Sequence, residues 1–166
     1  MNIFVLSEDP FLAASQVCDK HVVKMIVESA QMLSTVHRMI DGVMERRPSK
    51  SGSMLQYFKL DDEREGILYK ACHYNHPSTV WTRRSKSTYM WLYNHMMALG
   101  DEYTKRYGKT HLSITKCEDA LKIEPFGIDY NGFKQPPQCM PDEFKDECSV
   151  KAYWNYYIGE KHNVAN

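Results

Sequence analysis

The segment of residues 19–40 places the strongest constraint on the fold of this chain. At about 100° per residue, its apolar side chains cover most of a helix surface, and only a stripe roughly 100° wide is polar. A helix with this balance must be mostly buried. Its polar strip must then face a pocket, a groove or a polar partner, because unpaired charges are costly in a core. The strip consists of His21, Lys24, Glu28, Gln31, Thr35 and Arg38.

The polar strip admits two interpretations. Its imidazole, amine, carboxylate and amide are groups that serve in catalysis, and a carboxylate beside an amine in a partly desolvated site can have its pKa moved toward neutrality. Glu28 is then the strongest catalytic candidate, with His21 and Lys24 as its neighbours. Alternatively, Lys24 and Glu28 form an ordinary i,i+4 ion pair on a solvent-exposed strip.

The composition favours one compact domain over residues 1–166, since 43% of the residues are hydrophobic. Twenty-one basic residues balance 21 acidic residues, so any binding to nucleic acid must depend on a local patch of charge. Five cysteines without a CxxC pair, and a start that lacks the features of a signal peptide, indicate a cytoplasmic protein with reduced thiols. No apolar run approaches the roughly 20 residues of a membrane span, so we expect no membrane partner. We also expect no cofactor.

The remaining signals predict an all-α fold, a compact single-domain helical bundle with long irregular loops. Asp9-Pro10 is typical of a helix start, and Gly42 and Gly108 are typical of helix ends, where glycine accepts the left-handed conformation. Two stretches rich in proline, glycine and polar residues, 46–53 and 124–148, are expected to be loops. The expected helices after the first long one cover residues 85–107, residues 113–123 with Ser113 as the cap, and residues 149–161.

A second candidate region runs through residues 72–86. Aromatic side chains can stack on a base, an amide can contact a base edge, and arginine can bind a phosphate. Two histidines beside Cys72 could also be metal ligands, but no second ligand pair has a recognisable spacing, so no metal is expected. The alternative is a loop before a helix, with solvated arginines. With Gln31 from the polar strip, the predicted binding residues here are His73, Asn75, His76, Trp81, Arg83, Arg84 and Lys86.

Three segments of the chain resemble the pyrimidine-dimer DNA glycosylases of the phage endonuclease V type. Lys20-His21-Val22, followed by Glu28, resembles the Gln-His-Leu step of that family and its catalytic glutamate seven residues after the histidine. Residues 91–108 look like the middle helix of the family. The C-terminal aromatic segment would otherwise be interpreted as core. It is similar to the tail that reaches damaged DNA, and the matching residues are Trp154, Tyr156, Tyr157 and Gly159.

The resemblance implies a small all-helical DNA-repair enzyme. In such enzymes an amine attacks C1′ of the sugar to form a Schiff base, strand scission follows by elimination, and a glutamate stabilises the sugar cation and assists proton transfer. The family uses the α-amine of a small residue that is exposed when the initiator methionine is removed. Residue 2 here is Asn, a poor substrate for that removal, so the nucleophile is expected to be the Met1 amine or Lys24, unless the lyase step is absent.

Three functions are therefore compatible with the sequence. The leading one is a DNA glycosylase and abasic-site lyase that acts on a damaged or modified base. A second is an enzyme of the same scaffold that acts on a free nucleotide or nucleobase, which the neutral charge favours because the family itself is markedly basic. The third is a non-catalytic, phage-encoded protein that binds a ligand or a partner.

Overall fold

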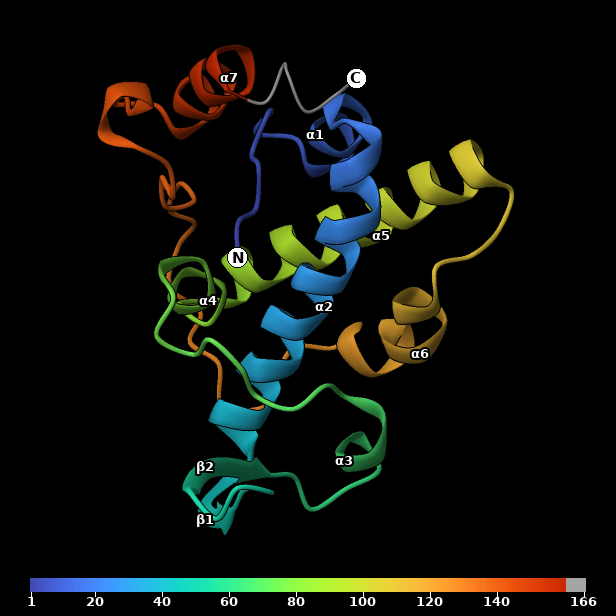
Figure 1. Cartoon of the computed structure of the whole chain (residues 1–166), viewed down its shortest axis with the longest axis vertical. Helices are drawn as coiled ribbons and strands as arrows, with labels where there is room; N and C mark the ends of the chain where they lie inside the picture. The colour runs from blue at the N-terminus through green and yellow to red at the C-terminus, as the bar shows by residue number, and fades with distance from the viewer. Residues whose placement is uncertain (161–166) are drawn as a thin grey trace.

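The computed structural model describes residues 1–160 and is mostly helical (Figure 1). Within these residues the all-α prediction is correct for most of the chain and wrong for residues 43–59, which form a two-stranded sheet. The elements in chain order are α1 (Pro10–Gln16), α2 (Asp19–Asp41), β1 (Val43–Pro48), β2 (Met54–Lys59), α3 (Arg64–Ile67), α4 (Pro77–Thr82), α5 (Lys86–Tyr107), α6 (Leu112–Leu121), the 3₁₀ turn η1 (Asp142–Phe144) and α7 (Ser149–Gly159).

The long helix α2 is the centre of the fold, as its wide apolar surface predicts. It packs against α4, α5 and α6, and it crosses α5 in the middle of the molecule (Figure 1). Gly42 ends α2, but not for the expected reason, because its φ of −88° is not left-handed. A Cβ atom at residue 42 would lie 2.3 Å from the carbonyl oxygen of Arg38 and 2.9 Å from that of Lys59. Glycine is therefore required by close packing.

The other helix boundaries follow their capping residues. Ser85 caps α5 in a reciprocal arrangement with Thr88. Gly108 ends the helix with a left-handed φ of 68°, as predicted. The cap of α6 is His111 and not Ser113, because the His111 side chain accepts a hydrogen bond from the Ser113 backbone N–H. The helix expected over residues 149–161 ends at Gly159, and Lys161 lies outside the described residues.

The predicted long loop after α6 is held in place by hydrogen bonds to helices. Trp81 of α4 donates to the carbonyl of Lys134 at 2.8 Å, and Ser149 of α7 donates to that of Pro136 at 2.7 Å. Within residues 124–148 the only helical element is the short η1 turn. The loop therefore joins α4 to α7 by defined contacts.

The expected loop over residues 46–53 is instead the end of one strand and the turn of a β-hairpin. β1 pairs with β2 in antiparallel register, with Val43 opposite Lys59 and Pro48 opposite Met54. Both strands are largely exposed, so the sequence lacks the apolar alternation of a half-buried strand. Contacts with residues outside the hairpin stabilise it.

Arg38, at the C-terminal end of the polar strip, supplies those contacts. Its guanidinium is 1% exposed and pairs with Glu65 at 2.5 Å. Burial opposes ionisation of Glu65, but hydrogen bonds from Tyr57, the Leu60 backbone and Arg38 lower the pKa of this carboxyl to about 2. The same guanidinium also donates to the backbone carbonyls of Phe58, Glu65, Leu68 and Tyr69. This end of the strip is therefore structural.

We expect Arg38→Met to destabilise the protein by roughly 3 kcal/mol, because it leaves buried carbonyls and a carboxylate without their donor. The matched control is Arg47→Met, whose guanidinium is 46% exposed and should cost less than about 1 kcal/mol. Urea unfolding measures both free energies of unfolding. Equal losses in the two variants would show that the buried guanidinium is not what holds the hairpin.

Candidate active site

The first six residues form an extended arm that packs against α2, α4 and α7. Residues 3–6 are buried, and Phe4 stacks on His21 of α2 with ring centroids 4.2 Å apart. Phe4 has a φ of 55°, a left-handed conformation that is uncommon for a bulky residue. These residues belong to no strand, so the start of the chain is an arm packed on the helices.

The arm brings the start of the chain onto Glu28. The backbone N–H of Asn2 donates to Oε2 of Glu28 at 3.1 Å, and Nζ of Lys24 lies 3.3 Å from Oε1. The Glu28 side chain is 14% exposed, whereas that of Lys24 is 67% exposed. The i,i+4 pair of the plainer interpretation therefore exists, but the carboxylate also faces the N-terminal arm.

Asn2 is fixed by residues from distant parts of the chain. Its side-chain amide donates to the carbonyl of Cys139 at 2.9 Å, and its Oδ1 accepts from the Tyr153 hydroxyl at 2.6 Å. Tyr153 is fully buried and lies 2.8 Å from the carbonyl oxygen of Pro137. The backbone nitrogen of residue 2 is therefore held at one position relative to Glu28.

The loop before α4 carries His73 and His76, and the charge of Glu28 acts on His76. Burial lowers the pKa of His76, the Met1 ammonium and His73 lower it further, and the Glu28 carboxylate opposes this shift. Burial also raises the pKa of the Cys72 thiol, and the Met1 ammonium opposes that shift. Met1, Glu28 and His73 thus all act on the pKa of His76, and we call these four residues the Glu28 cluster.

The loop has its own supports. His73 has a φ of 46°, and such strain in a non-glycine residue is found preferentially at functional sites. The Cys72 backbone N–H donates to Thr35 of α2 at 3.1 Å, and Arg83 donates to the carbonyl of Tyr74. Arg83 therefore supports the loop from behind and does not itself contact Glu28. Asn75 is exposed at the turn of this loop.

Four other predicted residues lie around the arm or beside the Glu28 cluster. His21 pairs through Nδ1 with the Tyr157 hydroxyl, and burial raises the pKa of Tyr157. Trp154 donates to the carbonyl of Leu6 at 2.8 Å, and Tyr157 packs edge-on against Phe4, so both residues of α7 contact the arm. Gln31 is half-buried on α2, one helical turn after Glu28.

The remaining predicted binding residues lie around a groove of about 560 Å³ between α4 and the loop that follows α6. Arg84 is exposed there, but the Trp81 indole is 6% exposed and packs edge-on against Trp91 and Phe133. Lys86, near this groove, pairs with Glu124. The residues that line the groove are Pro77, Val80, Trp81, Arg83, Arg84, Asp129, Lys134, Gln135 and Pro137.

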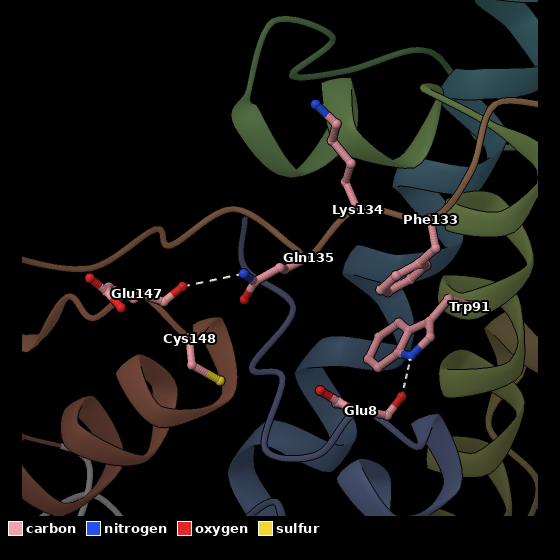
Figure 2. Close-up of a pocket in the computed structure, with 7 residues that line it drawn as sticks. All are labelled: Glu8, Trp91, Phe133, Lys134, Gln135, Glu147 and Cys148. Atoms are coloured by element: carbon pink, nitrogen blue, oxygen red, sulfur yellow. Dashed lines mark hydrogen bonds between the residues drawn. The ribbon is translucent and has the colours of Figure 1, made fainter.

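A larger hollow, of about 960 Å³, has no residue of the Glu28 cluster in its lining (Figure 2). In it Phe133 lies over Trp91, whose indole donates to the carbonyl of Glu8 at 2.7 Å, while the side chain of Lys134 points away from Cys148 (Figure 2). The side chains drawn there form no ion pair with one another. Within residues 1–160, no three His, Cys, Asp or Glu side chains are grouped as metal ligands. We take the Glu28 cluster as the candidate active site because a carboxylate there contacts both Lys24 and the start of the chain.

Comparison with known families gives a match over the first 115 residues. A family model described as pyrimidine dimer DNA glycosylase matches residues 1–115. The chain belongs to this family. Membership implies glycosylase activity on pyrimidine dimers, and therefore a DNA substrate. No curated protein and no solved structure was found to match the chain.

The segment matched by the pyrimidine dimer DNA glycosylase family covers the arm and the helices α1 to α5, and so contains the whole Glu28 cluster. It ends before the loop after α6 and before α7, so Lys134, Trp154 and Tyr157 lie outside it. Among the described residues, no helix has the length and apolar character that a membrane crossing needs.

Sequence reasoning did not identify Asn2 or Tyr153 as contributors to the site. The two residues hydrogen-bond across a separation of 151 positions, and no local pattern reports such a contact. The apolar residues 3–6 at the start of the chain are the one sequence feature consistent with an arm packed on the core.

The geometry of the Glu28 cluster predicts that Glu28→Gln lowers the pKa of His76 further, because the carboxylate is the group that raises it. NMR titration of the histidine ring measures this pKa without any assay of activity. The control is Glu63→Gln, an exposed carboxyl on another part of the surface, which should leave the titration of His76 unchanged. If the titration is the same in all three proteins, the cluster is not assembled as described.

Proposed function

We propose that the protein is a DNA glycosylase and abasic-site lyase that removes a damaged base with its N-terminal amine as the nucleophile and Glu28 as the assisting carboxylate. The observation that carries this proposal is the hydrogen bond between the Asn2 backbone N–H and Glu28, because it places a carboxylate at the start of the chain. Covalent catalysis by an amine requires such a neighbour to accept and return protons.

In the proposed reaction, the neutral amine attacks C1′ of the sugar, and the bond between C1′ and the base breaks. The base leaves with the bonding electrons and takes up a proton, and the attacking nitrogen loses one proton. The C1′–O4′ bond then breaks, O4′ takes up a proton, and the protonated imine forms between C1′ and the nitrogen. The carboxylate of Glu28 stabilises the positive charge that develops on the sugar. Removal of a proton from C2′ then expels the 3′ phosphate and cleaves the strand. The damaged nucleotide or its partner must leave the base stack for the amine to reach C1′.

Three nitrogens lie close enough to Glu28 to be considered as the nucleophile. The Met1 amine is favoured in the chain as it stands, since its charge acts on both His76 and Cys72. If Met1 is removed, the nitrogen of Asn2, at 3.1 Å from Glu28, becomes the terminal amine at the same site. Lys24 is also near, but its side chain is 67% exposed and extends into solvent, where no enclosed site would hold the sugar against it.

We further propose that the groove between α4 and the following loop receives the DNA strand. Arg84 and Lys134 supply positive charge there, and Arg83 connects the groove to the loop of His73 and His76. Gln31 and Asn75 are placed to contact the substrate beside the cluster. Trp81 supports the groove from its floor, because its indole is buried.

A second candidate function is an enzyme of the same scaffold that acts on a free nucleotide. The net charge of zero favours it, as does the size of the groove, because small-ligand sites commonly measure about 300 to 1,000 Å³. The two functions differ in salt dependence: duplex binding weakens steeply as salt rises, whereas binding of one nucleotide changes little.

The test is incision of a duplex that carries one pyrimidine dimer. We expect Glu28→Gln to lower the rate by about 10²-fold or more, because proton transfer and charge stabilisation are both lost. The melting temperature and the affinity for the damaged duplex should remain close to those of the unmodified protein. Glu63→Gln is the matched control and should keep full activity. Full incision by Glu28→Gln, or none by the unmodified protein, would contradict the proposal.

A further inference from the structure

The β-hairpin of residues 43–59 concentrates positive charge in a neutral protein. It contains four basic residues and one acidic residue, whereas the whole chain has 21 of each. Arg47 pairs with Glu45 and lies over the Tyr57 ring at 3.7 Å. The other three basic residues are exposed and form no ion pair with any residue among 1–160, namely Arg46, Lys50 and Lys59.

The hairpin also keeps an unusually apolar surface in contact with solvent. More than half of the surface of Val43, Met44, Met54 and Leu55 is exposed, at 62%, 51%, 56% and 56%. Arg38, Glu65 and the loop before α4 hold it against the body of the protein. An antiparallel two-stranded ribbon of this kind has the dimensions to enter a DNA groove and contact the flanking phosphates.

The hairpin is joined to the active site through Tyr74. The Tyr74 hydroxyl donates to Gln56 of β2 at 2.8 Å, and its ring packs edge-on against Phe58 at 5.9 Å. Tyr74 belongs to the same loop as His73 and His76, and its carbonyl accepts from Arg83. A strand of DNA bound at the Glu28 cluster would therefore approach the hairpin along this loop.

The distance along α2 agrees with contact on one duplex. The hairpin lies at the C-terminal end of α2, at one end of the molecule (Figure 1). Glu28 and Gly42 are fourteen residues apart, or roughly 21 Å at about 1.5 Å per residue. This length corresponds to about six base pairs, at 3.4 Å per step.

From these observations we propose that the hairpin binds the phosphate backbone of duplex DNA about half a helical turn from the lesion. This inference rests on the proposed function. The occupant is a polyanion because the hairpin carries a net positive charge. A symmetric contact with a second copy would instead bring two positively charged hairpins together. The hairpin thus supplies the local charge that a neutral chain needs to hold DNA.

The test compares two double variants that remove the same charge. Arg46→Ala with Lys50→Ala changes the hairpin, and Lys109→Ala with Lys122→Ala changes exposed lysines near the ends of α5 and α6. Each pair is made in the Glu28→Gln background, and binding to a dimer-containing duplex is followed by fluorescence anisotropy from 50 to 200 mM salt. The hairpin pair should weaken binding about tenfold at low salt. It should also reduce the slope of log K against log salt by up to about 1.8, because each phosphate contact contributes about 0.9.

The control pair, Lys109→Ala with Lys122→Ala, should change both the affinity at low salt and the slope of log K against log salt by less than the hairpin pair does. If the two pairs behave alike, the hairpin does not bind DNA, although the proposed function stands. If the unmodified protein binds no duplex, both the hairpin inference and the proposed function are wrong. If the hairpin pair instead changes the sedimentation of the free protein and leaves DNA binding intact, the hairpin is a self-association surface and the inference is overturned. Arg46→Lys with Lys50→Arg should retain binding, because both charges are kept.

Discussion

The burial of α2 is the constraint on which the rest of the structure depends. A helix covered by α4, α5 and α6 leaves only one narrow line of polar side chains, and every charge on that line must find a partner. The partners come from segments far along the chain. The N-terminal arm meets Glu28, and the hairpin and the segment after it meet Arg38. The polar strip of one helix thus determines where the start of the chain and the hairpin lie.

The two ends of the polar strip have different surroundings. This difference explains why Arg38 stabilises the fold, whereas Glu28 is the catalytic candidate. Arg38 is fully enclosed and donates hydrogen bonds to backbone carbonyls, so it stabilises the fold. Glu28 is partly exposed, contacts Lys24 and the Asn2 backbone, and acts on the pKa of His76. A carboxylate in these surroundings can exchange protons with a substrate.

Much of the helical framework could be predicted from the sequence, because the signals for α2 and α5 are local. Their periodicity lies within one segment, and Asp9, Ser85 and Gly108 mark helix ends through contacts with their immediate neighbours. The hairpin could not be predicted in this way, since its strands are exposed and its anchors are Arg38 and Tyr74. The family resemblance identified Glu28 and His21, but it gave no indication of a hairpin.

The site was predictable in its parts but not in its assembly. Spacing along α2 singled out Glu28 and Lys24, and composition singled out His73 and His76. That these residues meet the Met1 amine follows from the path of the arm, which depends on the contacts of Asn2 with Tyr153 and Cys139. Those contacts join the two ends of the chain, so they appear only once the tertiary fold is known.

The most direct measurement of the central claim is borohydride trapping on abasic duplex DNA, with the modified peptide identified by mass spectrometry. A terminal amine beside Glu28 predicts a covalent adduct on the α-nitrogen of the first residue, and the same adduct in Lys24→Ala. The mass of the peptide also shows whether that residue is Met1 or Asn2. An adduct on Lys24, or no adduct under conditions where the protein cleaves DNA, would contradict this account.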